Sequence, residues 1–227
     1  MRLPLNPTVP PSDLLKEGWS VHIRKWKFHL ALTALFLPLI MASRGWWIPE
    51  VAWGLVAKPA AFKPDMILVD NLVTDYKLFE KARNLRKLET ATTVLVPVRA
   101  SDRDPDKPDP MGFQIARVMI RQARLQPCRI LPFREVEPFT LNLARQVGEF
   151  LKSHPDIHSV LVVTQACRSR RTQLVYGKVL GKLGAKVSTY PVWNSDRAGN
   201  WAATWHGRQE VLLQYIKLIY YELYLYR

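Results

Sequence analysis

The sequence predicts an α/β fold: a doubly wound, mainly parallel, five-stranded Rossmann-like sheet preceded by an N-terminal transmembrane helix. Short apolar segments rich in β-branched residues alternate with segments whose apolar residues recur at helical spacing. The apolar segments hold few polar residues, which is typical of parallel strands buried on both faces. A basic stretch and a longer apolar run precede the first of them.

Each expected element follows from its own pattern. Strands are expected at 65–70, 92–98, 128–133, 158–164 and 186–192. Helices are expected at 75–87, 112–125, 140–153, 169–184 and about 202–226, the last of them amphipathic. Gly184 should cap the helix that ends there, because glycine readily adopts the left-handed conformation that ends many helices. The proline-rich, charged segment 99–110 should be a loop.

The apolar run 28–42 follows the basic residues "RKWK". By itself it is shorter than the roughly 20 residues that span a bilayer. Extension to Ile48 completes a span and places Trp46 and Trp47 at the far interface. The basic flank should keep the N-terminus in the cytoplasm. A cleaved signal peptide fits poorly because of the long preceding segment, and a buried helix of a soluble protein is the other alternative.

These features divide the chain into four parts. We expect a cytoplasmic segment at 1–27, a transmembrane helix at 28–48, a membrane-proximal linker at 49–63 and an α/β domain at 64–227. The chain would then cross the membrane once, with its main domain on the far side.

The chain is strongly basic, with 33 Lys and Arg against 19 Asp and Glu and a formal net charge of +14. Such an excess favours anionic partners, among them phosphorylated ligands, anionic lipid, nucleic acid and acidic proteins. Solubility, or a bias toward lipid headgroups, explains it equally well. No nucleic-acid-binding motif accompanies the charge, so nucleic acid is not an expected partner, whereas membrane lipid and a small anionic ligand are.

Familiar catalytic and metal-binding patterns are missing from the sequence. It holds no GxSxG, GxxxxGK[ST], GxGxxG or HExxH motif. The 2 cysteines make neither a disulfide framework nor a zinc set. The 5 histidines are scattered, and His154 and His158, at spacing i, i+4, are separated by Pro155. We therefore expect no metal and no cofactor.

The stretch "VTQACRSRR" (163–171) runs from the fourth expected strand into the next helix. In doubly wound folds, ligands bind at the carboxyl ends of the strands, where helix N-termini attract anions. Thr164, Arg168, Arg170 and Arg171 would then form an anion cradle, since guanidinium groups bind phosphates and carboxylates bidentately. In the alternative, Arg168 and Arg170 face solvent and Arg171 pairs with a nearby carboxylate.

Four segments together resemble a bacterial envelope family typified by SanA, ElyC and YdcF, over about Trp53 to Tyr221. In order they are "WGLVAKPAAFKPDMILVDN", "VEPFTLNLARQVGEFL", "VLVVTQACRSRRTQLVYGKVL" and "NWAATWHGRQEVLLQYIKLIYYEL". The resemblance implies a bacterial inner-membrane protein with a periplasmic domain and a link to polysaccharide or peptidoglycan upkeep. A nucleotide-like ligand is implied by the resemblance only.

The chain departs from this family where chemistry would occur. Asp70, Asn71 and Leu72 replace the glycines that end the first strand. Asn142 and Leu143 stand where an acid is usual, Arg168 replaces a histidine and Gln214 a glutamate. Thr140, Arg170, Arg171 and Lys217 persist. General acid–base catalysis needs groups that titrate near the working pH, and the losses remove most of them.

Asp70 is the only candidate catalytic residue left, and it could equally form a structural salt bridge with Arg168 or Arg171. The expected ligand-binding residues are Asn71, Thr140, Asn142, Thr164, Arg168, Arg170, Arg171 and Gln214. Two functions stay open. One is a non-catalytic binding or accessory subunit of an envelope or membrane complex, with membrane-protein partners. The other is an envelope enzyme acting on an anionic, lipid-linked or nucleotide-like substrate. The lost residues favour the first.

Overall fold

The computed structural model describes residues 11–60, 62–72, 74–89, 93–193 and 200–225. The chain divides into two compact units, Met1–Trp47 and Ile48–Arg227. The larger unit contains the whole sheet and the candidate site. Parts of four expected segments fall outside the described residues: residues 1–10 of the N-terminal segment, residue 61 of the linker, residue 92 of a strand and residue 226 of the last helix.

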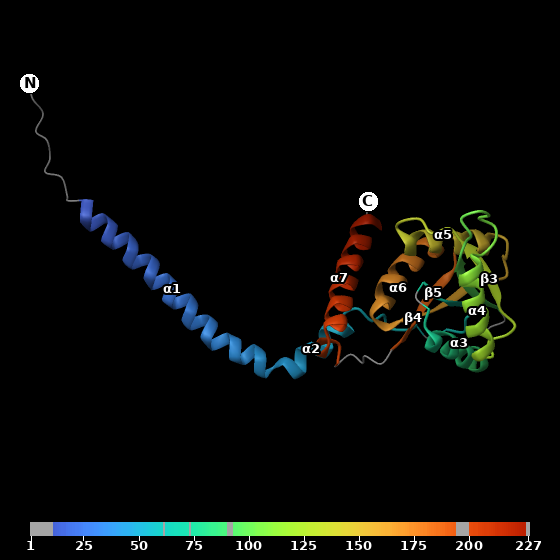
Figure 1. Ribbon diagram of the computed structural model, residues 1–227, viewed down its shortest axis with the longest axis horizontal. Coiled ribbons are helices and arrows are strands. Elements are labelled where there is room, and N and C mark those ends of the chain that lie inside the picture. The colour runs from blue at the N-terminus through green and yellow to red at the C-terminus, as the bar shows by residue number, and fades with distance from the viewer. Residues whose placement is uncertain (1–10, 61, 73, 90–92, 194–199, 226–227) are drawn as a thin grey trace, which may run out of the picture. The chain divides into compact units, whose positions relative to one another are not determined.

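A five-stranded, all-parallel sheet forms the centre of the larger unit, as the sequence predicts (Figure 1). Its strands are β1 Met66–Val69, β2 Thr93–Arg99, β3 Arg129–Phe133, β4 Ser159–Gln165 and β5 Lys186–Val192. Their spatial order is β3-β2-β1-β4-β5, so the winding direction reverses between β1 and β4. Ile67 of β1 aligns with Val94 on one side and with Leu161 on the other.

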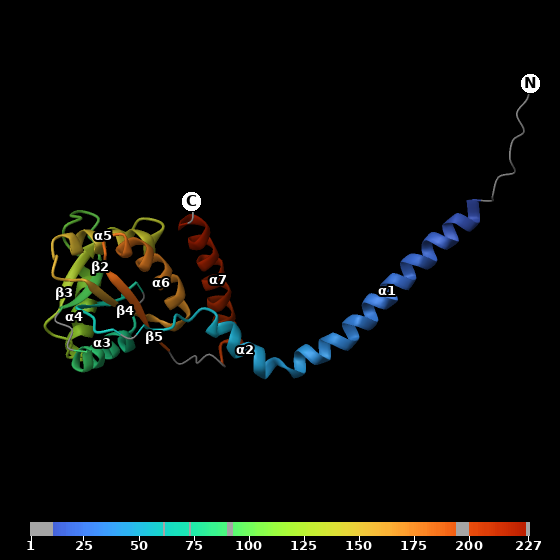
Figure 2. The same cartoon turned by 180° about the vertical axis from the view of Figure 1, so that it is seen from behind.

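Helices follow the strands in strict alternation. They are α3 Tyr76–Glu89, α4 Pro110–Gln122, α5 Phe139–Lys152, α6 Ala166–Gly181 and, after the short 3-10 helix η1 Trp201–Ala203, α7 Trp205–Leu225. Figures 1 and 2 show α5 and α6 on one side of the sheet and α3 and α4 on the other. α7 packs against α6 rather than directly on the sheet.

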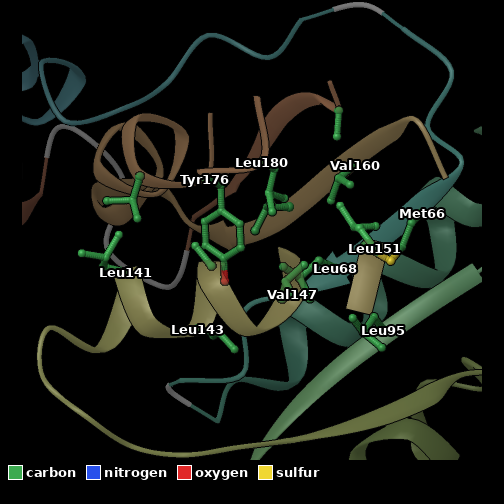
Figure 3. Packing of buried hydrophobic residues seen from close by; sticks show 14 of the residues in the cluster. Met66, Leu68, Leu95, Leu141, Leu143, Val147, Leu151, Val160, Tyr176 and Leu180 are labelled. Carbon is green, nitrogen blue, oxygen red and sulfur yellow. The ribbon is translucent and has the colours of Figure 1, made fainter. Parts of the chain in front are cut away.

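Two apolar layers sandwich the sheet because neighbouring strand residues point to opposite faces. Met66 and Leu68 of β1 belong to the layer under α5 and α6, whereas Ile67 and Val69 belong to the layer under α3 and α4. Figure 3 shows the first layer, where Tyr176 inserts between the helices and the strands. All four β1 residues are fully buried, which explains why the strand lacks an alternating polar pattern.

Gly184 caps α6, as expected. Its φ is +81°, and its N–H donates to the carbonyl of Gly181 at 3.0 Å while the N–H of Ala185 donates to that of Leu180 at 3.2 Å. This pair of bonds is the Schellman arrangement, in which a left-handed residue satisfies carbonyl groups at the helix end.

The segment between α2 (Arg44–Trp53) and β1 is part of the folded unit, although the sequence suggested a plain linker. Leu55 is only 1% exposed and packs beneath α7. The N–H of Ala57 donates to Ser169 Oγ at 2.9 Å, and the N–H of Ala60 donates to Ser188 Oγ at 2.8 Å. Hydrogen bonds to α6 and β5 therefore hold this segment across the α/β unit.

The N-terminal unit holds α1 Pro11–Ala42 and the start of α2 Arg44–Trp53. No single helix among the described residues is both long enough and apolar enough for a membrane span. Trp26–Ala42 and Arg44–Trp53 meet that test only as a pair, with a bend of 70°. The expected continuous helix 28–48 is thus not confirmed. The break falls at Ser43, whose hydroxyl donates to the Leu39 carbonyl at 2.8 Å, a bond that often bends helices.

Candidate functional site

The candidate site lies where the winding reverses, beyond the carboxyl ends of β1 and β4, the usual ligand position in doubly wound folds. Asp70 follows β1 and Thr164 belongs to β4, so parallel pairing brings them together. The hydroxyl of Thr164 donates to Asp70 Oδ2 at 2.6 Å. Thr164 is fully buried and Asp70 is 6% exposed. Asp70 Oδ1 has no hydrogen-bond partner in the described part of the chain.

Arg171, from the second turn of α6, supplies the positive charge of the site. It is 8% exposed, and its Nη1 donates to the hydroxyl of Thr140, at the start of α5, at 2.8 Å. Its guanidinium lies 5.6 Å from the centre of the Tyr221 ring. Burial lowers the pKa of Arg171, and the charge of Asp70 opposes that effect. The Nε of Arg171 has no partner among the described residues.

Arg168 is half-buried and turned toward α7, where its Nε lies 3.4 Å from Glu210 Oε1. Gln214 donates from Nε2 to the same oxygen at 2.9 Å. Glu210 is an acidic residue that sequence reasoning missed, although it precedes Gln214 by four residues and so shares its helix face. Its charge offsets that of Arg168.

Arg170 does not reach the site. It is exposed, and its Nη1 donates to the carbonyl of Gly54 at 2.7 Å, while its backbone N–H donates to the carbonyl of Leu55 at 3.0 Å. The residue therefore fastens the segment after α2 to the start of α6.

The two expected asparagines, Asn71 and Asn142, do not join the buried cluster either. Asn71 Nδ2 donates to the carbonyl of Pro97 in β2 at 3.2 Å, so this residue stays at the rim of the site. Asn142 Nδ2 donates to the carbonyl of Val136 at 2.7 Å, in the loop before α5. Of the expected ligand-binding residues, the structure thus gathers Thr140, Thr164 and Arg171 around Asp70.

Tyr176 is a second buried group that the sequence did not single out. It is 1% exposed and its hydroxyl has no partner within the described residues. Burial raises its pKa well above the usual value, and the charge of Asp70 adds to this effect. The phenol is therefore a neutral hydrogen-bonding group, and no pattern of spacing in the sequence distinguishes it from an ordinary core tyrosine.

The arrangement provides one buried carboxylate, one buried guanidinium and neutral hydroxyl groups. These groups fix charges and hydrogen bonds. His206, at the start of α7, is exposed. Among the described residues no group of three or more His, Cys, Asp or Glu side chains is arranged to hold a metal ion.

The fold and this site define a Rossmann-like α/β protein with a buried polar cluster at its topological switch point. Comparison of the chain with protein-family models gives no match, and comparison with curated proteins gives none either.

Proposed function

We propose that this chain is a membrane-anchored, non-catalytic binding or accessory subunit of an envelope or membrane complex, built on a SanA/ElyC/YdcF-like domain. The observation that carries the proposal is what the three arginines at the start of α6, here called the basic turn, bind. Arg168, Arg170 and Arg171 bind acceptors of the chain itself. Arginines engaged in this way hold neighbouring elements of the chain together.

The three arginines join α6 to three different parts of the chain. Arg168 reaches α7, Arg170 reaches the segment after α2, and Arg171 reaches α5. Hydrogen bonds of this kind hold the joined elements in place. A rigid α/β unit without a titrating acid–base pair suits a binding role better than proton-transfer chemistry.

The N-terminal unit supports the anchor. Apolar side chains along α1 are exposed, among them Phe28, Leu35 and Leu39 at 65%, 70% and 63%. Such a surface is costly in water and favourable in lipid. The proposed anchor is a broken span whose basic N-terminal flank stays in the cytoplasm of a bacterium. The α/β unit then lies in the periplasm, at the inner membrane.

Labelling of intact cells with a membrane-impermeant thiol reagent tests this topology. Cysteines replace Ser12 or Asp102 in a chain whose native Cys128 and Cys167 are changed to alanine. Asp102 is a suitable reporter because its side chain is 87% exposed. We expect labelling at position 102 and not at position 12, and the opposite pattern would refute the orientation.

A second candidate function is an envelope enzyme for an anionic, lipid-linked or nucleotide-like substrate. The unpartnered Oδ1 of the buried Asp70 favours it, because a carboxylate oxygen with no protein donor is free to accept one from a ligand. A separate pocket of about 290 Å³ lies beyond the ends of β2 and β3 and is lined partly by Arg99, Arg134 and Glu135, but by none of the residues gathered around Asp70.

The variant Asp70→Asn in the native host distinguishes the two functions. The accessory function predicts either impaired incorporation into a membrane complex, measured by co-purification in mild detergent, or no effect. Normal co-purification together with loss of an envelope phenotype would contradict the accessory function and support the enzymatic one. Thr164→Val is the matched control, because it removes the hydrogen bond to Asp70 Oδ2 and keeps the carboxylate.

A further inference from the structure

α7 carries a second apolar face that no other described element of the Ile48–Arg227 unit covers. Its inner face buries Val211, Leu218 and Tyr221. Its outer face exposes large side chains to between 45% and 66%: Leu212, Leu213, Ile216, Ile219, Tyr220, Leu223 and Tyr224. An amphipathic helix would be polar there. We propose that this outer face is the interface of an antiparallel homodimer, formed with α7 of a second copy of this chain. The inference does not depend on the Asp70 site.

The spacing of the outer face is that of a helix–helix seam. From Trp205, steps of four and three residues lead in turn to Gln209, Leu212, Ile216, Ile219 and Leu223. This heptad pattern is what two helices need in order to interlock along their length. α7 has 21 residues, which is three heptads. An apolar face that lies on lipid follows the same steps, so the charges beside the seam decide between a second helix and a membrane.

The chain supplies its own complementary charges. Arg208 and Glu222 lie on one flank of the seam, two heptads apart, on exposed and half-buried positions. Neither forms a salt bridge within the described residues. In an antiparallel pair each flank meets the same flank of the other helix. The register that places Trp205 opposite Leu223 therefore also places each Arg208 beside the second copy's Glu222.

The other flank suits the same register. Leu213 lies at the two-fold axis, opposite its own counterpart, and Tyr220 lies opposite His206 of the second copy. Parallel pairing offers no such match, because Arg208 and Glu222 are 14 residues apart, about 21 Å along a helix. The charges therefore favour a second copy over an unrelated protein, and an antiparallel arrangement over a parallel one.

Cysteine cross-linking of the full chain in native membranes tests the geometry. Leu213→Cys should form a disulfide-linked dimer under mild oxidation, because the two positions meet at the axis. Leu223→Cys is the matched control on the same face. In the antiparallel dimer the two 223 positions should lie about 27 Å apart along the helix axis, which is the rise of the 18 residues from 205 to 223, and they should not cross-link. The unsubstituted chain, with Cys128 and Cys167, sets the background. Cross-linking at 223 and not at 213 would overturn the antiparallel arrangement.

Charge reversal tests the identity of the partner. Arg208→Glu and Glu222→Arg, each in the Leu213→Cys chain, should separately weaken self-association about tenfold, because each puts like charges together at both ends. Differently tagged copies of the two variants, expressed together, should cross-link to each other as efficiently as the parent. Absence of this rescue would refute the second copy as occupant. A heterologous protein captured at position 213 would refute it too, as would quenching of a fluorophore there by brominated lipid.

Discussion

At the scale of single residues, burial separates three arginines that look alike in the sequence. Arg170 is exposed and Arg168 is half-buried, while Arg171 is 8% exposed beside a 6% exposed Asp70. A buried cation is tolerated when a counter-charge and hydrogen-bond acceptors surround it. Asp70, Thr140 and Tyr221 provide these for Arg171. Arg171 is therefore the residue of the basic turn on which the fold depends most.

Replacement of Arg171 by alanine should destabilise the protein strongly. The change leaves Asp70 buried without its cationic neighbour and Thr140 without its donor, at a cost of about 3–5 kcal/mol in the free energy of unfolding. Urea unfolding measures the effect. Arg145→Ala, at an exposed position of α5, is the control and should change the value by less than about 0.5 kcal/mol. Equal unfolding curves for both variants would show that Arg171 is only solvated.

Asp65 should make stability depend on pH. Burial raises its pKa, but hydrogen bonds from the Ser159 hydroxyl and from the N–H groups of His158 and Ser159 outweigh burial and lower it. A lowered pKa in the folded state means that the stabilisation is present above the usual pKa and is lost as pH falls through the folded value. Asp65→Asn should thus be less stable than the parent at pH 7 and approach it as pH falls through the folded-state pKa, below the ordinary 3.8. Asp156→Asn, the same substitution at an exposed position, is the matched control. A deficit that stays constant with pH would contradict this role.

At the scale of elements, helix ends and close approaches decide how the pieces meet. Gly207 lies in the first turn of α7, where its N–H donates to Thr204 Oγ1 at 3.0 Å. A β-carbon at this position would collide with the backbone carbonyl of Trp201 in η1. Backbone yields less readily than a flexible side chain, so glycine allows α7 to start directly against η1.

The variant Gly207→Ala should lose about 1–3 kcal/mol of stability, because η1 and α7 must move apart. Gly181→Ala is the matched control, since no atom lies within 4 Å of an added β-carbon there. It should gain up to about 1 kcal/mol from the higher helix propensity of alanine. Thermal unfolding of the two variants provides the comparison, and a neutral Gly207→Ala would refute the collision.

At the scale of the whole molecule, the α/β unit includes more chain than its alternating elements. The segment after α2 buries Leu55 and donates from Ala57 and Ala60 to Ser169 and Ser188. Trp201 Nε1 and the hydroxyl of Tyr215 donate to the carbonyls of Ile48 and Val51 at 2.7 and 2.6 Å. Residues 48–60 are thus fastened to α6, α7 and β5 by bonds that span more than 100 residues of sequence.

Two truncations test whether the α/β unit begins at residue 48. A chain starting at residue 48 should fold with a cooperative transition, because the division into two compact units falls after Trp47. A chain starting at residue 61 should be less stable by about 2–4 kcal/mol, from lost burial of Leu55 and lost hydrogen bonds. Chemical unfolding of both chains measures the difference. Equal stability would mean that residues 48–60 are a mere linker.

The order and type of the elements could be predicted from the sequence because they depend on local patterns. β-branched runs such as that of β4, helical spacing as in α5, and Gly184 after α6 all act over a few residues. Alternation of strands and helices then leaves few arrangements other than a parallel, doubly wound sheet. The position of Asp70 and Thr164 at the carboxyl ends of two strands followed from the same reasoning.

What the side chains bind was decided only by the tertiary structure. Arg168, Arg170 and Arg171 bind residues 42, 116 and 31 positions away, so their neighbours in the sequence carry no information about their partners. The exposure of the outer face of α7 could not be predicted for the same reason. Periodicity indicates which faces of a helix are apolar, but not which of two apolar faces is covered. Local periodicity determines the elements, because its range is one or two turns; burial and pairing depend on contacts between distant segments, which exist only once the chain has folded.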